Sequence, residues 1–189
     1  MTQRRRFPRE VFQEQALEVL PNVPLEKGVP KTNQSTKYAD YDDGDLQTGL
    51  TRTGPRYTDN GDGTITDNAT NLMWAKDPSD LGPSWGSLGN PTPKTWLDAL
   101  ELCHLLSLGG HTDWRLPNIK ELGSLVNYGR WDPCFGDIYF PNTQSAPYWS
   151  STTYHNITTY AWAVQCADGR IDPEAKATTQ YIRPVRGGL

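Results

Sequence analysis

All seven tryptophans of this chain lie between Trp74 and Trp162, and residues 1–54 contain none. Large aromatic rings dominate the energetics of protein cores, so we place the core where they gather. Hydrophobic residues make up 35% of the 189 residues, against a usual value of about 45–50%. The 17 Gly and 15 Pro residues favour turns and loops. The sequence therefore predicts one loop-rich domain, built around a few large rings, behind an N-terminal tail.

The charge and hydropathy of the chain argue against two classes of partner. The net charge is -4 and the isoelectric point is about 5.3, which is not typical of a general nucleic-acid binder. No stretch approaches the ~18 consecutive apolar residues of a membrane span. Residues 4–6 (RRR) resemble the start of a twin-arginine export signal, but Pro8 and polar residues follow where an apolar segment is needed. We therefore expect no nucleic acid, no membrane span and no signal peptide in this sequence.

Residues 1–54 are expected to form an N-terminal arm without a core of its own. Apolar residues at loose helical spacing predict a short helix within residues 1–20, which Pro21 ends. Residues 21–56 contain repeated Pro and Gly and an acidic cluster, and they predict an extended tract. Such an arm needs another surface to hold it. We therefore expect residues 1–54 to anchor the protein or to contact other subunits, in a homo-oligomer or a larger assembly.

The folded domain is expected over residues 55–189. Residues 60–63 (NGDG) stand between two short β-prone runs and predict a tight hairpin turn. An EF-hand-like calcium loop with Gly63 at its sixth position would need ligands from Thr58 and Ala69 at its first and twelfth positions. Because alanine cannot chelate, we predict a hairpin turn and no metal site here.

Two helices are predicted in the middle of the domain. The first has Thr92 as its cap and ends before Gly109. The second begins where Asn118 and Glu121 have the spacing of a capping box. Further strands are expected at residues 72–74, 148–151, 160–166 and 181–186.

The chain lacks the sequence motifs of common enzyme active sites. It contains no GxSxG or HExxH motif, no phosphate-binding loop and no dinucleotide fingerprint. Of its three histidines, His155 lies in a polar loop and is the best candidate for a ligand contact. Its three cysteines (Cys103, Cys134 and Cys166) leave open either one disulfide with a free thiol or three buried thiols. We therefore predict a protein that is not an enzyme and uses no cofactor.

Residues 148–181 are the best candidate for a recognition surface. They are rich in Tyr, Trp, Asn, Ser and Thr, which binding surfaces favour because rings give contact area at low entropic cost and small polar groups adapt their hydrogen bonds. The loops 154–160 and 172–180 are predicted to contact a ligand, whereas Trp149 and Trp162 are predicted to pack in the core. The predicted ligand-binding residues are Tyr154, His155, Asn156, Thr158, Tyr160, Gln165, Lys176 and Gln180.

Six short strings stand in order along the domain. They are YTDNGDGTITDNATNLMW (57–74), the helix with Trp96, Ala99 and Cys103, DWRLPNIKELGSLVNY (113–128), YWSST (148–152), AWAV with a following DG (161–169) and IRPVRGG (182–188). In this order and spacing they resemble the Lcl C-terminal domain family over residues 55–188. These bacterial and phage domains are related to the C-type lectin-like and formylglycine-generating-enzyme-like fold.

The resemblance implies an α+β fold of the C-type lectin-like class. This fold would have small twisted antiparallel sheets, two helices and long ordered loops, preceded by the extended arm. The family is mostly described as ligand-binding, including attachment to glycans, and in receptor-binding members the C-terminal loops hold the contact residues. On this chain that region is residues 148–181. The framework residues implied by the resemblance are Trp74, Trp114, Arg115, Trp149 and Arg186, and Trp162 joins them as a predicted core residue.

Two departures from related proteins narrow the functional prediction. The EPN, QPD and WND motifs of calcium-dependent animal lectins are absent, so calcium-dependent sugar binding is not expected. Formylglycine-generating relatives hold copper with two cysteines near the C-terminus, where only Cys166 occurs. We therefore predict a non-catalytic recognition domain on a bacterial surface or a virion, binding a glycan or a cell-surface protein. The alternative is a structural subunit of a virion decoration, fibre or filament.

Overall fold

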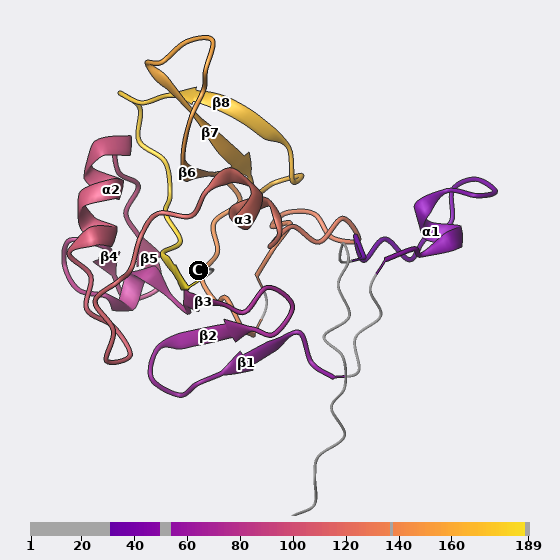
Figure 1. Cartoon of the computed structure of the whole chain (residues 1–189), viewed down its shortest axis with the longest axis horizontal. Helices are drawn as coiled ribbons and strands as arrows, with labels where there is room; N and C mark the ends of the chain where they lie inside the picture. Colours follow the sequence, from indigo (N-terminus) through magenta and orange to yellow (C-terminus); the bar gives the residue numbers. More distant parts are fainter. Residues whose placement is uncertain (1–30, 50–53, 137, 188–189) are drawn as a thin grey trace, which may run out of the picture.

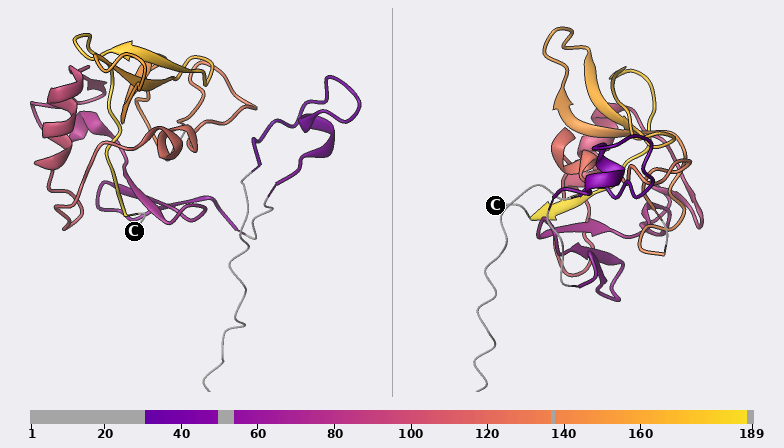
Figure 2. Two further views of the ribbon diagram at one scale, coloured as in Figure 1. Left: turned by 45° about the horizontal axis from the view of Figure 1, so that its top comes forward. Right: turned by 90° about the vertical axis from the view of Figure 1, so that its right-hand side faces the viewer.

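Residues 31–49, 54–136 and 138–187 are described by the computed structural model in Figure 1. The helix predicted within residues 1–20 lies outside them. Residues 31–49, called the lead-in segment below, stand to one side of the other described residues, and Figure 2 shows the same separation from a second direction. The described structure therefore has two parts: the lead-in segment and a domain that carries all the named strands.

A four-stranded antiparallel sheet joins the two ends of the domain. In the order of the sheet, its strands are Tyr57–Asp59 (β1), Thr64–Asp67 (β2), Leu72–Ala75 (β3) and Val185–Gly187 (β9). The predicted hairpin is confirmed, and Gly61 and Gly63 in its turn take positive φ angles of 77° and 85°, which other residues rarely adopt. The last strand begins later than predicted because the Tyr181 backbone bonds to Trp149 in the other sheet.

A three-stranded antiparallel sheet forms the second layer of the domain. Its strands, in order, are Pro147–Thr153 (β6), Tyr160–Gln165 (β7) and Ile171–Ala175 (β8). The strands β6 and β7 were predicted, but β8 was expected to belong to a loop, and that prediction is wrong. The sequence IDPEA lacks apolar alternation, yet all five of its residues pair with β7, from Val164 to Tyr160. Pro173 is tolerated because β8 is an edge strand.

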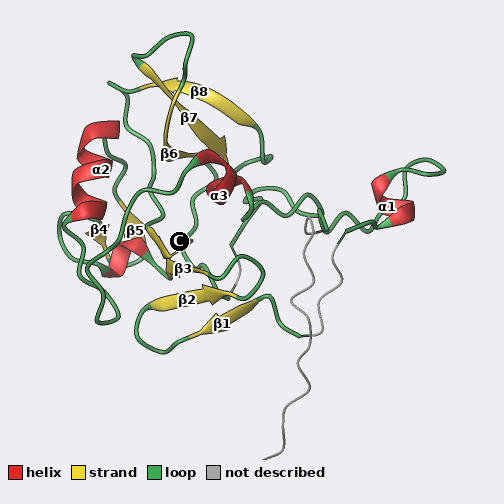
Figure 3. Ribbon diagram, in the orientation of Figure 1, coloured by secondary structure: helices red, strands yellow, loops and turns green. Residues whose placement is uncertain are grey.

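Two helices flank the sheets, and Figure 3 shows how much loop connects these elements. Helix α2 (Trp96–His104) is capped by Thr95 rather than by the predicted Thr92. Lys94 pairs with Gln180 as an isolated β-bridge, which keeps the chain extended before the cap. Helix α3 (Ile119–Gly123) begins with the predicted capping box of Asn118 and Glu121. The remaining short elements are η1 (Pro78–Asp80), β4 (Gly86–Ser87) and β5 (Asn90–Pro91).

The lead-in segment contains one helical turn that the sequence analysis did not predict. Helix α1 (Asp43–Leu46) forms within the acidic cluster of the tract expected to be extended. Asp42 caps it by accepting from the Asp45 N–H, and the same carboxylate accepts from the Tyr38 N–H at 2.8 Å. Closely spaced aspartates therefore fold the backbone locally, since each carboxylate accepts from nearby N–H groups.

Two hydrophobic clusters fill the domain. The first holds Trp74, Leu122 and Val164 and joins the four-stranded sheet to α3 and β7. The second holds Ala99 and Trp149 and joins α2 to β6. Because α2 and α3 each pack on β6, the three-stranded sheet is held on both sides, which fixes the position of its end loops.

The predicted framework residues take structural positions. Three of the tryptophans are at most 1% exposed, namely Trp74, Trp114 and Trp149. Trp162 is half-buried, so it packs less completely than predicted. Arg115 donates two hydrogen bonds of 2.7 Å to Glu121, and Arg186 donates to Asp113 at 2.7 Å.

The architecture confirms an α+β class with small antiparallel sheets. Across the described ranges, no helix combines the length and apolar character needed to cross a membrane.

Candidate recognition surface

The connection between β6 and β7, residues 154–160, is called the recognition turn below. It stands at the open end of the three-stranded sheet, at the top of Figure 1. The Tyr154 N–H donates to the Tyr160 carbonyl at 2.9 Å, and the Tyr160 N–H donates to the Ile157 carbonyl at 2.9 Å. Residues 155–159 are exposed. The turn is therefore closed by its own backbone while its tip faces solvent.

An aromatic pair supports the recognition turn from below. The Tyr154 ring packs edge-on against Trp162 of β7, with ring centroids 5.0 Å apart. The Tyr154 hydroxyl accepts a hydrogen bond from Asn156 Nδ2 at 3.3 Å. This arrangement explains why Trp162 is only half-buried, since it covers the base of an exposed turn. It also links the Asn156 side chain to this aromatic pair through the Tyr154 hydroxyl.

Lys176, which follows β8, links the recognition turn to helix α2. Its Nζ lies 3.9 Å from the centroid of the Trp96 ring and donates to Thr153 Oγ1 at 2.8 Å. Its backbone N–H donates to the Thr159 carbonyl at 2.9 Å. A cation over an indole face is favourable by about 0.5–2 kcal/mol, depending on its exposure. The ammonium group is therefore held at a fixed place beside the turn.

Trp96 lies in the candidate surface, although it was not among the predicted ligand-binding residues. Its side chain is half-buried, and its Nε1 donates to the Ser150 carbonyl at 2.8 Å. Trp96 is the first residue of the helix, so its ring lies at the helix end that meets Lys176. The presence of a lysine near the end of a predicted binding loop was the only available signal.

The structure brings most of the predicted ligand-binding residues together. Those on or beside the recognition turn are Tyr154, His155, Asn156, Thr158, Tyr160 and Lys176. Gln180 lies on the α2 side, where its backbone exchanges two hydrogen bonds of 2.8 and 2.9 Å with Lys94. Gln165 does not join them, because it ends β7 at the opposite side of the sheet, about 17 Å along the strand at 3.3 Å per residue.

A concave region lies beside the Asp-rich hairpin, apart from the recognition turn. A cavity of about 400 Å³ is lined there by residues that include Asp59, Asp62, Lys76 and Asp77. These carboxylates are already engaged, since Asp59 accepts from Lys76 Nζ at 2.6 Å and Asp77 accepts from Asn142 at 2.6 Å. The hydrogen bond from Lys76 lowers the pKa of Asp59. Among the residues that the structure describes, no cluster of three His, Cys, Asp or Glu side chains is placed to hold a metal ion.

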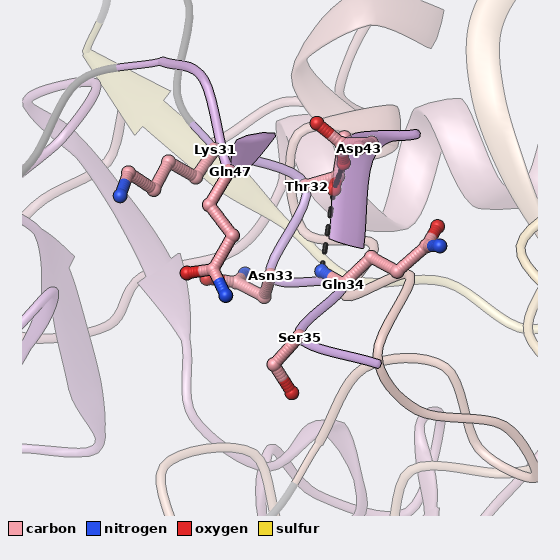
Figure 4. Close-up of a pocket in the computed structure, with 7 residues that line it drawn as sticks. All are labelled: Lys31, Thr32, Asn33, Gln34, Ser35, Asp43 and Gln47. Carbon is pink, nitrogen blue, oxygen red and sulfur yellow. Dashed lines mark hydrogen bonds between the residues drawn. The ribbon is translucent and has the colours of Figure 1, made fainter. Parts of the chain in front are cut away.

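Another concave region belongs to the lead-in segment, and Figure 4 shows its lining residues. The cavity, of about 230 Å³, is lined by Lys31, Thr32, Asn33, Gln34, Ser35, Asp43 and Gln47. The Thr32 hydroxyl donates to Asp43 and accepts from the Gln34 N–H at 3.2 Å. Thr32 and Asp43 therefore spend their polar groups on holding the segment in shape, so the recognition turn remains the stronger candidate.

Comparison with known families identifies the domain. The profile of the Lcl C-terminal domain family matches residues 63–186. The chain belongs to this family. The family resemblance noted in the sequence is thereby confirmed. The match runs from the β1–β2 turn into β9, so β2, β3, the three-stranded sheet, α2, α3 and the recognition turn of this Lcl C-terminal domain lie inside it, whereas β1 precedes it. A comparison with curated proteins found no match.

Proposed function

We propose that this Lcl C-terminal domain is a non-catalytic recognition domain of the C-type lectin-like class. It would bind a glycan or a cell-surface protein, and it would act on a bacterial surface or a virion. The observation that carries the proposal is the recognition turn, whose exposed polar tip is held in shape by the Tyr154–Trp162 contact and by the backbone bond from Lys176. A turn that is ordered before binding loses less conformational entropy when a ligand docks.

The chemistry of this surface suits recognition rather than catalysis. The exposed residues His155, Asn156 and Thr158 offer donors and acceptors, and the Tyr154 and Trp162 rings beneath them offer apolar area. The fixed Lys176 ammonium adds one positive charge at the edge. Nearby rings and polar groups of this kind fit the alternating apolar and hydroxyl faces of a sugar, and they fit an equally mixed protein surface.

The fold class is supported by three features of the domain. Its sheets are small and antiparallel, its first and last strands lie in one sheet, and long loops join its elements. Each feature is expected of a C-type lectin-like domain. In such a domain the first and last strands lie in one sheet, and the scaffold presents long loops.

The binding test replaces the exposed tip of the turn and leaves its supports in place. The combined His155→Ala, Asn156→Ala and Thr158→Ala variant is compared with the wild-type chain on a glycan array and on immobilised bacterial envelope proteins. We expect a loss of affinity of about ten-fold or more for the best-bound probe, with unchanged unfolding. His104→Ala is the matched control, since His104 is exposed on α2 outside this surface. Equal binding by the triple variant and the wild type would refute the site.

The alternative proposal is a subunit of an ordered assembly, and the lead-in segment favours it. This segment projects to one side of the domain, and Tyr38 and Tyr41 on it are 80% and 82% exposed. Exposed rings on a projecting segment suit contact with a neighbouring subunit, and a homo-oligomer is the simplest form. The mass in solution of the full chain and of a form lacking residues 1–54 tests this proposal. A monomeric full chain with a protease-sensitive arm would contradict it.

A further inference from the structure

Two of the three cysteines, far apart in sequence, meet inside the first hydrophobic cluster. Cys134 and Cys166 are each 0% exposed, and their Sγ atoms lie 3.7 Å apart. The Cys134 N–H donates to the Cys166 carbonyl at 2.6 Å, so the two backbones are also in contact. A disulfide bond is about 2.05 Å long, so closing it requires the sulfurs to approach by about 1.7 Å. A small rotation of the two side chains supplies such a movement, since the backbones already lie side by side.

We propose that Cys134 and Cys166 form a disulfide when the chain folds in an oxidising compartment. The oxidant is a disulfide such as oxidised glutathione or a thiol–disulfide oxidoreductase. One cysteine thiolate attacks the oxidant's S–S bond and forms a mixed disulfide, and one oxidant thiol leaves. The second cysteine then attacks the mixed disulfide and releases the other oxidant thiol. The cysteines together lose two electrons and two protons, and the oxidant gains both.

The environment of the pair distinguishes the two sulfurs. The hydrogen bond from the Cys134 thiol lowers the pKa of Cys166, burial opposes this effect, and backbone groups of Phe135 and Cys134 lower it further. The same hydrogen bond, together with burial, raises the pKa of Cys134. The two thiols therefore share one hydrogen bond, which places each sulfur beside its partner.

Cys103 is not a competing partner. It lies on α2 in the second hydrophobic cluster, among residues such as Ala99 and Trp114, whereas both members of the pair lie in the first cluster. Burial alone raises the pKa of the Cys103 thiol. The third cysteine is therefore expected to remain a thiol, which settles which of the pairings left open by the sequence is formed.

The crosslink would secure an irregular part of the domain. Residues 129–136 and 138–146, as far as the structure describes this stretch, belong to no helix or strand, and Trp131 and Ile138 are 81% and 80% exposed. Cys134 anchors this stretch, and Cys166 follows directly after β7. A disulfide between residues 32 positions apart restricts the unfolded chain and keeps the stretch on the sheet when the domain opens locally.

The experiment uses the full chain, refolded from denaturant in a glutathione redox buffer. Free thiols are counted under denaturing conditions, and the crosslinked peptides are mapped by mass spectrometry without reduction. We expect one free thiol per chain, on Cys103, and a peptide pair joining Cys134 to Cys166. The oxidised protein should melt roughly 5–10 °C above the reduced protein.

Two variants keep the outcome decisive. Cys103→Ala should retain the crosslink and show no free thiol, and its melting temperature should still rise on oxidation. Cys134→Ala should show no crosslink within one chain and no rise. Three free thiols in the refolded wild type, or a crosslink that includes Cys103, would overturn the proposal. Because peptide mapping of the wild type decides the pairing by itself, a variant that fails to fold does not block the test.

Discussion

The Lcl C-terminal domain buries its large aromatic side chains, whereas the lead-in segment exposes the aromatic side chains that it carries. In the domain, Trp74 and Trp149 are completely buried between sheets and helices, whereas Tyr38 and Tyr41 of the lead-in segment are more than four-fifths exposed. The lead-in segment is shaped instead by the Asp42 carboxylate, which accepts three backbone N–H groups. Rings stabilise a structure only where several elements enclose them, and a short segment has too few residues to do so.

The two parts should also differ in how they unfold. The domain is held by two continuous clusters, so it is expected to unfold cooperatively. The lead-in segment touches the domain at isolated points, such as the hydrogen bond from the Tyr128 N–H to the Thr32 carbonyl at 2.9 Å. It should therefore open without unfolding the domain. The four predictions below test this difference, beginning with the largest expected effect.

Removing one buried ring should cost far more stability than removing one exposed ring. Trp149→Ala deletes a side chain that is 0% exposed and whose Nε1 donates to the Lys94 carbonyl at 2.9 Å. We expect it to lower the free energy of unfolding by about 3–5 kcal/mol, through lost burial and a cavity. Tyr41→Ala should change it by less than about 0.5 kcal/mol. Urea unfolding followed by circular dichroism measures both, and similar costs would contradict the contrast.

Adding one methyl group should destabilise both parts, but only one of them globally. At Gly169, with φ of 82°, a Cβ would lie 2.6 Å from Val126 Cγ1, and we expect a global loss of about 2–3 kcal/mol. At Gly44 a Cβ would lie 2.0 Å from the Thr36 carbonyl oxygen. Gly44→Ala should therefore melt the lead-in segment and leave the urea midpoint of the domain unchanged, which hydrogen exchange of residues 38–47 would report.

Gly110→Ala is the control for Gly169→Ala, because it separates the cost of steric crowding from the cost of backbone strain. Gly110 has a similar φ of 75°, but no atom lies within 4 Å of its added Cβ. Gly110→Ala should therefore cost only the roughly 1–2 kcal/mol of the left-handed backbone. If Gly110→Ala and Gly169→Ala cost the same, the contact with Val126 contributes nothing.

Acid should weaken the domain through Glu121. Burial raises the pKa of Glu121, but hydrogen bonds from Arg115 and the Asn118 N–H, together with the Arg115 charge, lower it overall. Because the folded pKa lies below the unfolded one, this stabilisation is complete above the unfolded pKa and disappears as the pH falls through the folded pKa. Since Arg115 is 41% exposed, solvent screens the pair, and Glu121→Gln should cost about 1 kcal/mol at pH 7.

The pH dependence of that variant provides the check. The difference between Glu121→Gln and the wild type should shrink as the pH falls below 4.5, the ordinary pKa of a glutamate. Asp42→Asn is the counterpart in the lead-in segment, where the backbone N–H of Tyr38 contributes most to a lowered pKa. It should speed hydrogen exchange of the Tyr38 and Ala39 amides without moving the unfolding midpoint at any pH. A constant cost of Glu121→Gln from pH 7 to pH 3 would contradict this account.

The smallest effect is expected where the two parts meet. A Cβ on Gly129 would lie 2.4 Å from the Asn33 carbonyl oxygen, so Gly129→Ala should push the lead-in segment off the domain. Limited proteolysis should cut residues 31–49 faster, while the free energy of unfolding changes by less than about 0.5 kcal/mol. A loss of several kcal/mol would show that the lead-in segment is an integral part of the fold.

Features that depend on near neighbours were predictable from the sequence. The NGDG turn and the capping box of Asn118 and Glu121 each form within a few residues, so their chemistry is complete in the printed sequence. The family could also be recognised from strings of local sequence. The cap at Thr95 and the strand β8 could not be predicted, since the first depends on the bridge between Lys94 and Gln180 and the second on the free edge of β7.

Some features of the candidate site could likewise be predicted from the sequence, and others depended on the tertiary structure. The sequence by itself determined that an aromatic and polar segment near the C-terminus forms a turn, because its composition favours one. Only the tertiary structure decided that Lys176 lies over Trp96, that Gln165 lies at the end of β7 opposite to the turn, and that Cys134 meets Cys166. These contacts join residues up to 80 positions apart in the numbering. Their partners are chosen by how sheets and helices pack, and a local pattern carries no information about a distant neighbour.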